Sequence, residues 1–274
     1  MRSRLIIAAI FIPILLILFI FVPILGLAIL FSAVSMIAVY EVLCATGLMK
    51  HRRIQLYSLI FSGCVPFWVY YGADGSVGAT GLCIYTILLF IETIVDRKRI
   101  TFEKIGTTAF VAFIIPYFFS SFVRLGRMEL GRFFALLPLL IAFISDAGGL
   151  FFGLMFGRHK LAPELSPKKS VEGAVGSVIV SLLASILYGV IVRFGFKIAV
   201  SFPLMCVYAV LGSVVSQFGD LCFSFIKRQY GIKDFGRMLA GHGGIMDRFD
   251  SVFFCAPFIE MLVMLIPVFS KAVI

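Results

Sequence analysis

Residues 224–250, SFIKRQYGIKDFGRMLAGHGGIMDRFD, place a dense cluster of ionisable groups between two apolar segments, 198–222 and 251–270. Each flanking segment holds about 20 mainly apolar residues, the length that an α-helix needs to cross a bilayer. The stretch carries acidic and basic side chains, a histidine and a pair of glycines, and a connecting loop needs none of that chemistry. It therefore predicts a membrane protein with a polar site in one of its loops.

The rest of the chain is equally apolar. Hydrophobic residues make up 61% and charged residues 14% of the 274 positions, against about half and about a quarter in soluble domains. Nine segments are long and apolar enough to span a membrane. They are roughly 5–21, 24–43, 54–72, 77–95, 105–123, 134–156, 173–192, 198–222 and 251–270. We expect an all-α, polytopic integral membrane protein of about nine transmembrane helices.

The distribution of charge predicts the topology. Nine helices place most of the 24 lysine and arginine residues on the side of the N-terminus, so the positive-inside rule makes the N-terminus cytoplasmic. The two richest polar loops, 157–172 and 223–250, then face the cytoplasm together. Topology and anionic lipid headgroups account for the net charge of +10, so we expect no nucleic-acid partner. We divide the chain into an N-terminal region of five spans, 1–130, and a C-terminal region of four spans, 131–274, which carries the loops 157–172 and 223–250.

Several acidic side chains predict a cation site. One face of the eighth span carries the polar stripe Gln217, Asp220, Ser224 and Lys227. A carboxylate within the bilayer costs at least about 2.5 kcal/mol, so Asp220 is expected to face a cavity or a partner. Asp247 and Asp250 are three residues apart and point the same way if the segment is helical. Carboxylate oxygens suit Mg²⁺ better than zinc. Ion pairing of Asp220 and a helix-dipole role for the other two acids are the structural alternatives.

Two further features surround these acids. Residues 157–173 carry Arg158, Lys160, Lys168 and Lys169, which topology alone could explain but which could also grip phosphates. Asp146 is a further buried acid of the sixth span. The pair Gly243-Gly244 lets successive backbone N–H groups turn toward an anion. The spacing of Gly149, Gly153 and Gly157 favours close packing against a neighbouring helix.

A resemblance to a known family rests on one long run: Ser224-x-x-Lys227-Arg228-x-x-x-x-Lys233-Asp234-x-Gly236…His242-Gly243-Gly244-x-x-Asp247-Arg248-x-Asp250. It resembles the signature of the phosphatidate cytidylyltransferases, the CDP-diacylglycerol synthases. Two other runs resemble the same family: Ser145-Asp146 through Gly157-x-x-Lys160-Leu-Ala-Pro163-x-x-Ser166-Pro167-Lys168-Lys169-Ser170-x-Glu172-Gly173, and Gln217-x-Gly219-Asp220. The chain departs from the family at Ala240, Gly149-Leu150 and Val171, none of which removes a charged group.

The resemblance implies that CTP and phosphatidate give CDP-diacylglycerol and pyrophosphate, with Mg²⁺ as cofactor and a second metal or a monovalent cation left open. Catalytic roles fall to Asp220, Asp247, Asp250, Lys227 and Arg248. Metal binding falls to Asp220 and Asp247, with Asp250 and Asp146 as further ligands or orienting groups. Substrate binding falls to Lys160, Ser166, Lys168, Lys169, Ser224, Arg228, Lys233, Asp234, His242, Gly243 and Gly244. The expected setting is a bacterial inner membrane, with the active site at its cytoplasmic side. The expected partners include membrane lipids, and whether the protein forms a homodimer is left open.

Three alternatives to this function remain. A CTP-dependent polyprenol or dolichol kinase would transfer a phosphate in place of a cytidylyl group. A CDP-alcohol phosphatidyltransferase is disfavoured because its D-G-x-x-A-R run is absent from the sequence. A transporter could use intramembrane acids, but here the charges cluster on one side and the two halves show no paired broken helices.

Overall fold

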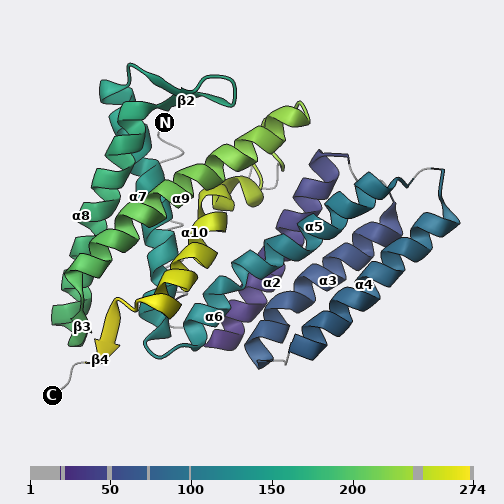
Figure 1. The fold of residues 1–274 in the computed structure, drawn as a ribbon, viewed down its shortest axis with the longest axis horizontal. Helices are drawn as coiled ribbons and strands as arrows, with labels where there is room; N and C mark the ends of the chain where they lie inside the picture. Colours follow the sequence, from purple (N-terminus) through teal and green to yellow (C-terminus); the bar gives the residue numbers. More distant parts are fainter. Residues whose placement is uncertain are drawn as a thin grey trace. The chain divides into compact units, whose positions relative to one another are not determined.

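The computed structural model describes residues 19, 22–47, 51–72, 75–98, 100–236 and 243–271, and most of them are helical (Figure 1). The helices are α2 (Ile24–Ala45), α3 (Arg52–Tyr71), α4 (Gly75–Val95), α5 (Phe102–Phe119), α6 (Ser121–Arg127), α7 (Gly131–Phe156), α8 (Val171–Phe196), α9 (Phe202–Gln229) and α10 (Met246–Leu265). The strands are β1 (Lys160–Ala162), β2 (Ser166–Ser170), β3 (Ile198–Val200) and β4 (Phe269–Lys271). The predicted helical class is confirmed.

Within the described ranges, six helical segments are long and apolar enough to cross a membrane, as an integral membrane protein requires. They are α2, α4, α5 with α6, α7, α8 and α9. α3 begins with two arginines and α10 carries four charged side chains, which makes both less apolar. The predicted span 5–21 lies outside the described residues. Nine crossings and a cytoplasmic N-terminus therefore stay predictions.

By its contacts the chain falls into two compact units. The first contains residues 1–127 and 230–248, and the second contains residues 128–229 and 249–274. The polar segment that follows α9 thus belongs to the same unit as the N-terminal helices, and the boundary falls inside the first turn of α10. The division at residue 130 that the sequence suggests is a functional one and stays a prediction.

Aromatic packing forms the core of the first unit. Phe31 of α2 stacks on Phe122 of α6 with ring centroids 4.5 Å apart, and Phe19 meets both rings edge-on. Ser32 of α2 donates a hydrogen bond to the carbonyl oxygen of Gly63 in α3 at 2.7 Å. These contacts fix α2, whose last turns carry the buried Glu41.

Small residues hold α7 and α8 together in the second unit. Ser177 of α8 donates a hydrogen bond to the carbonyl oxygen of Ser145 in α7 at 2.8 Å. A Cβ at Gly149 would lie 2.5 Å from the Ser177 hydroxyl, and a Cβ at Gly173 would lie 2.7 Å from the carbonyl oxygen of Gly149. A Cβ at Gly153 would meet Ser170. Close packing, the interpretation favoured for the α7 glycines, is therefore confirmed.

We expect Gly173→Ala to destabilise the protein by about 1–3 kcal/mol, because its Cβ would push two helix backbones apart. The control is Gly195→Ala in the same helix, where a Cβ would meet nothing within 4 Å and alanine favours the helix. Thermal unfolding of both variants in detergent is the measurement. An equal unfolding temperature for Gly173→Ala and the wild type would contradict this account of the interface.

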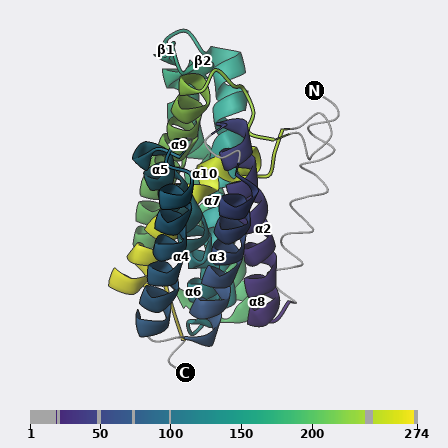
Figure 2. The ribbon, with the colours of Figure 1, turned by 90° about the vertical axis from the view of Figure 1, so that its right-hand side faces the viewer.

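Two antiparallel pairs of strands lie at opposite ends of α8 (Figures 1 and 2). The β1–β2 hairpin forms from the loop 157–172, with Lys160 opposite Ser170. At the other end β3 pairs with β4, with Val200 opposite Phe269. This pairing corrects two predicted spans, because 198–200 and 269–271 are strands and not helix ends. Lys197 ends α8 with a φ of 55°, and the short apolar stretch that follows is too short for hydropathy to separate strand from helix.

Candidate active site

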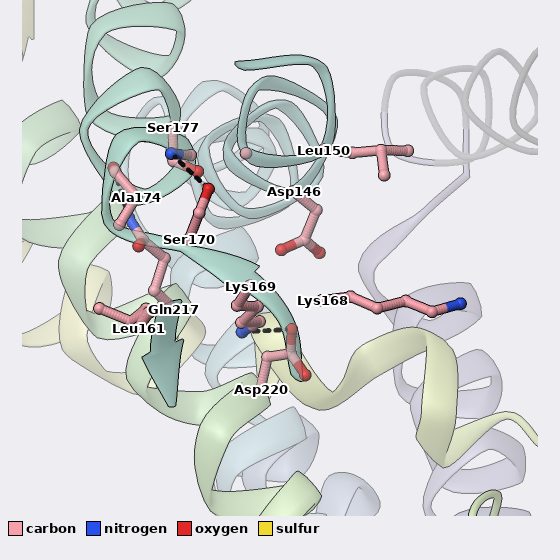
Figure 3. A pocket seen from close by; sticks show the side chains of 12 residues that line it. Asp146, Leu150, Leu161, Lys168, Lys169, Ser170, Ala174, Ser177, Gln217 and Asp220 are labelled. Atoms are coloured by element: carbon pink, nitrogen blue, oxygen red, sulfur yellow. Dashed lines mark hydrogen bonds and ion pairs between the residues drawn. The ribbon is translucent and has the colours of Figure 1, made fainter. Parts of the chain in front are cut away.

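A pocket of about 210 Å³ opens in the second unit among α7, β2, α8 and α9 (Figure 3). Its wall combines ionisable side chains with glycines and apolar groups. The lining residues are Asp146, Gly149, Leu150, Leu161, Lys168, Lys169, Ser170, Gly173, Ala174, Ser177, Gln217 and Asp220. Five of them, Asp146, Lys168, Lys169, Gln217 and Asp220, belong to the polar groups that the sequence singled out.

The central contact of this pocket is an ion pair between β2 and α9. The ammonium group of Lys169 lies 2.6 Å from Oδ2 of Asp220, and both side chains are about a quarter exposed. The hydroxyl of Ser224, one turn further along α9, donates to Oδ1 of Asp220 at 3.4 Å. Figure 3 shows the carboxylate of Asp146 turned toward this pair, whereas Lys168 extends away from it. The predicted polar stripe of α9 therefore faces the pocket at Asp220.

A second ion pair lies next to the first. The ammonium group of Lys227 in α9 is 3.5 Å from Oδ2 of Asp250 in α10, and both side chains are nearly buried. Gly219 permits this approach, because a Cβ there would lie 2.7 Å from the carbonyl oxygen of Asp250. The hydroxyl of Ser251 donates to Oδ2 of Asp146 at 2.7 Å. α10 therefore contributes to the acid cluster through two neighbouring residues.

Three carboxylates share this part of the second unit. Asp146, Asp220 and Asp250 are close enough for electrostatic repulsion, and Lys169 and Lys227 offset two of the three negative charges. Buried charges need such partners, since removing an ion from water is costly. Pairing of Asp220 with Lys227 or Arg228 is the structural alternative for this acid, and the ion pair found at Asp220 comes from Lys169.

The donor set fits a magnesium ion by its chemistry. Within the described ranges, no three His, Cys, Asp or Glu side chains converge as a ready-made cage for a metal. Mg²⁺ does not require one, since it is usually held by one or two carboxylates together with water and substrate phosphates. Asp146, Asp220 and Asp250 supply oxygen donors of that kind.

Glu172 organises the hairpin that carries Lys168 and Lys169. Its carboxylate accepts hydrogen bonds from the backbone N–H groups of Arg158 and His159 at 3.1 and 3.2 Å, and it lies 2.7 Å from Nδ1 of His159. These bonds close the segment between α7 and α8. Ser170 caps α8 by accepting a hydrogen bond from the N–H of Gly173 at 3.1 Å, which explains the Ser-x-Glu-Gly spacing.

Other predicted substrate-binding residues lie around the hairpin. Arg228 at the end of α9 donates from Nε to the carbonyl oxygen of Leu165 at 3.3 Å, in the turn between β1 and β2. Lys160 is exposed on β1 and Ser166 is partly buried at the start of β2. These three residues do not line the pocket itself. Their predicted roles in substrate binding stay predictions.

The remaining signature residues belong to the first unit, where Asp247 closes a tight turn. Oδ2 of Asp247 accepts hydrogen bonds from the N–H groups of Phe235 and Gly244 at 2.8 and 2.9 Å. Gly243 adopts a φ of 77°, a conformation that favours glycine. Lys233, Asp234 and Arg248 are exposed, and His242 lies outside the described residues. The predicted convergence of Asp247 with Asp220 and Asp250, and the phosphate cradle of Gly243 and Gly244, stay predictions.

Two residues of these sites escaped the sequence analysis. Ser251, the partner of Asp146, carries no signal, because a serine beside Asp250 resembles any other serine in an apolar helix. Glu41 is an isolated acid near the end of an apolar helix, and both of its carboxylate oxygens accept backbone hydrogen bonds at the start of α10. The signal for Glu41 was available, since an acid in an apolar span marks a functional site by default.

Comparisons with known proteins identify the family of the chain. A model of the cytidylyltransferase family matches residues 2–266. The phosphatidate cytidylyltransferase of Bacillus subtilis is 28% identical over 247 residues, 85% of this chain and 87% of the relative. That of Thermotoga maritima is 30% identical over 229 residues, 82% of this chain and 83% of the relative. That of Staphylococcus saprophyticus is 31% identical over 183 residues, 66% of this chain and 67% of the relative. The chain belongs to the cytidylyltransferase family.

Proposed function

We infer that the chain transfers the cytidylyl group of CTP to phosphatidate, giving CDP-diacylglycerol and pyrophosphate for phospholipid synthesis. The family and the names of three relatives support this reaction. The observation that links this reaction to particular residues is the Lys169–Asp220 ion pair in the wall of the pocket. This pair supports the assignment, because the ammonium group of Lys169 would hold a substrate phosphate beside a carboxylate suited to a metal ion.

The reaction needs positioning more than acid–base chemistry. The phosphate of phosphatidate is already an anion at neutral pH, so its oxygen attacks the α-phosphorus of CTP without a strong general base. A new P–O bond forms, the bond from the α-phosphorus to the bridging oxygen breaks, and pyrophosphate leaves with the electron pair. The protein's tasks are to align two polyanions and to stabilise charge on the leaving group.

We assign the phosphate contacts to the basic residues around the pocket. Lys169 and Lys227 already hold carboxylates in the second unit and can turn to phosphate oxygens. Lys168 lines the pocket and is exposed, so it is suited to draw in the more distant phosphates of CTP. Because about 210 Å³ is below the roughly 300–1,000 Å³ of pockets that enclose whole ligands, we propose that the pocket holds phosphate groups and not a complete substrate.

We propose Mg²⁺ as the cofactor. Following the signature, Asp220 and Asp247 are assigned as ligands, and Asp250 and Asp146 as further ligands or orienting groups. When bound, the ion would neutralise charge on the phosphates. A second metal ion or a monovalent cation is part of the same proposal, and metal titration of the purified enzyme tests each of them.

We propose the bacterial inner membrane as the location, with the active site at the cytoplasmic side. The six long apolar helices and the bacterial relatives support the first part, and the distribution of lysine and arginine supports the second. CTP then arrives from the cytoplasm and phosphatidate enters sideways from the bilayer. A homodimer stays a prediction, which the mass of the detergent-solubilised protein tests.

The proposed function is tested by measuring separately whether the α-phosphorus or the γ-phosphorus of CTP enters the lipid. Purified protein is incubated with phosphatidate, Mg²⁺ and CTP labelled with ³²P at the α- or the γ-phosphorus, with and without EDTA. We expect metal-dependent label in chloroform-extractable lipid from α-labelled CTP only. Label from γ-labelled CTP would identify a lipid kinase. Absence of both labels from folded protein, combined with electrogenic uptake into proteoliposomes, would favour a transporter.

The two lysines of the hairpin predict different kinetic effects. Lys168→Ala should raise the KM for CTP about threefold to tenfold, because a charge-assisted contact with phosphate is lost. Lys169→Ala should lower kcat as well, because it also removes the partner of Asp220. Lys98→Ala, which changes an exposed lysine of the first unit, is the control. An unchanged KM for both substrates in Lys168→Ala would refute its assignment.

A further inference from the structure

Glu41 occupies an unusual position for a charged residue. It lies in the last turns of the apolar helix α2, its side chain is buried, and the residue is only 5% exposed. Burying a carboxylate in an apolar helix is costly unless the charge is compensated. The structure supplies the compensation from the start of α10, more than 200 residues later in the chain.

Both oxygens of Glu41 are used by that helix start. Oε1 accepts a hydrogen bond from the N–H of Ile245 at 3.1 Å, and Oε2 accepts one from the N–H of Met246 at 3.0 Å. These are N–H groups that an α-helix cannot satisfy internally. A negative charge there also interacts favourably with the helix dipole. Glu41 therefore acts as a capping group that comes from a different helix.

Glu41 and Asp247 together engage three successive N–H groups. Asp247 accepts from Gly244, and Glu41 accepts from Ile245 and Met246. The turn that precedes α10 and the first residues of α10 are thus fixed by two carboxylates. Any displacement of Glu41 would leave the N–H groups of Ile245 and Met246 without these acceptors. It would also release the segment that orients Asp247.

Two glycines of the signature, Gly236 and Gly244, lie against the carboxylate of Glu41. A Cβ at Gly236 would lie closer than van der Waals contact to Oε1 of Glu41, and a Cβ at Gly244 would lie equally close to Oε2. The carboxylate therefore fills the space that a side chain at either position would need. Two glycines of the family signature are explained by a residue of the N-terminal half that the signature does not include.

We propose that Glu41 is a positioning residue for catalysis: it holds the Gly244–Met246 turn and thereby the carboxylate of Asp247. The inference rests on the proposed function, in which Asp247 serves the reaction. According to this proposal, α2 contributes a residue that positions the active site, although α2 is far from the signature in the sequence.

The first experiment is Glu41→Gln, which keeps the size of the side chain but replaces one acceptor oxygen with an amide donor that faces a backbone N–H. We expect kcat to fall about tenfold or more, because a buried donor loses its partner. The KM for CTP should change less than about threefold, because the substitution leaves the phosphate contacts assigned to Lys168 and Lys169 unchanged. The control is Glu92→Gln, another glutamate of an apolar helix in the first unit, which binds Arg53 and Tyr57.

The second experiment separates positioning from stability. Gly244→Ala should inactivate the wild type because its Cβ meets Glu41, but it should cost little more in a Glu41→Ala background, where that space is empty. Activities are expressed per folded protein, measured by thermal unfolding in the same detergent. Additive losses, or a Glu41→Gln enzyme whose kcat per folded protein equals that of the wild type, would overturn the inference. A wild type that is inactive in the α-label assay would instead overturn the proposed function.

Discussion

We expect Asp220→Asn to abolish cytidylyl transfer, with a loss in kcat of about a thousandfold or more, while the protein stays folded. The carboxylate pairs with Lys169 at 2.6 Å and accepts a hydrogen bond from Ser224 at 3.4 Å. An amide has nearly the same shape but carries no charge, so it neither holds the ammonium group in the pocket nor binds a cation. The fold is expected to survive because Asp220 is about a quarter exposed at its side chain and can be solvated.

The measurement is turnover of α-labelled CTP by purified Asp220→Asn at saturating substrate and Mg²⁺. Glu129→Gln is the matched control, since it neutralises an acid of the same unit whose ion pair with Lys271 is largely exposed. The control should keep wild-type activity. Full activity of folded Asp220→Asn would remove both the metal assignment and the assigned role of the Lys169 pair.

Asp247→Asn should lower kcat about a hundredfold or more. One carboxylate oxygen of Asp247 accepts two backbone hydrogen bonds, from Phe235 and Gly244, and both are strengthened by its negative charge. Asparagine weakens these bonds and removes the ligand that we assign to Mg²⁺. Because the turn stays partly bonded, we expect a folded protein with a displaced active-site segment.

The test for Asp247→Asn is a magnesium titration of turnover. A lost ligand shifts the half-saturating Mg²⁺ concentration upward, whereas a displaced turn lowers kcat at every concentration. Asp96→Asn, which changes a partly exposed acid next to His51 in the same unit, is the control. Wild-type turnover in Asp247→Asn would show that neither account of this residue is correct.

The acids of the pocket were predictable because charge is conspicuous in an apolar helix. Asp220 and Asp146 break apolar spans, and a carboxylate there needs a partner. The sequence also placed Lys169 among the phosphate contacts, but it could not select Lys169 over Lys227 as the partner of Asp220. That choice depends on the β1–β2 hairpin, whose pairing is a tertiary contact that hydropathy does not report.

The contacts of Glu41 were beyond prediction for a different reason. Its partners are backbone N–H groups, which every residue except proline carries, so no side chain in the sequence marks them. The β3–β4 pair was missed because three-residue apolar strands resemble the ends of apolar helices. Six of the predicted spans were therefore located well and their ends less well, whereas the contacts of Glu41 and the pairing of β3 with β4 were missed.

Two residues in the wall of the pocket between α7 and α8, Gly149 and Gly173, contribute no side chains there. At these two positions the wall cannot adjust by a change of rotamer, so its dimensions there are those of the helix backbones. In a saturation mutagenesis experiment these positions should tolerate hardly any enlargement, not even by one methyl group. Resistance to an inhibitor that fills this corner should then arise more readily at the flexible lysines than at the glycines.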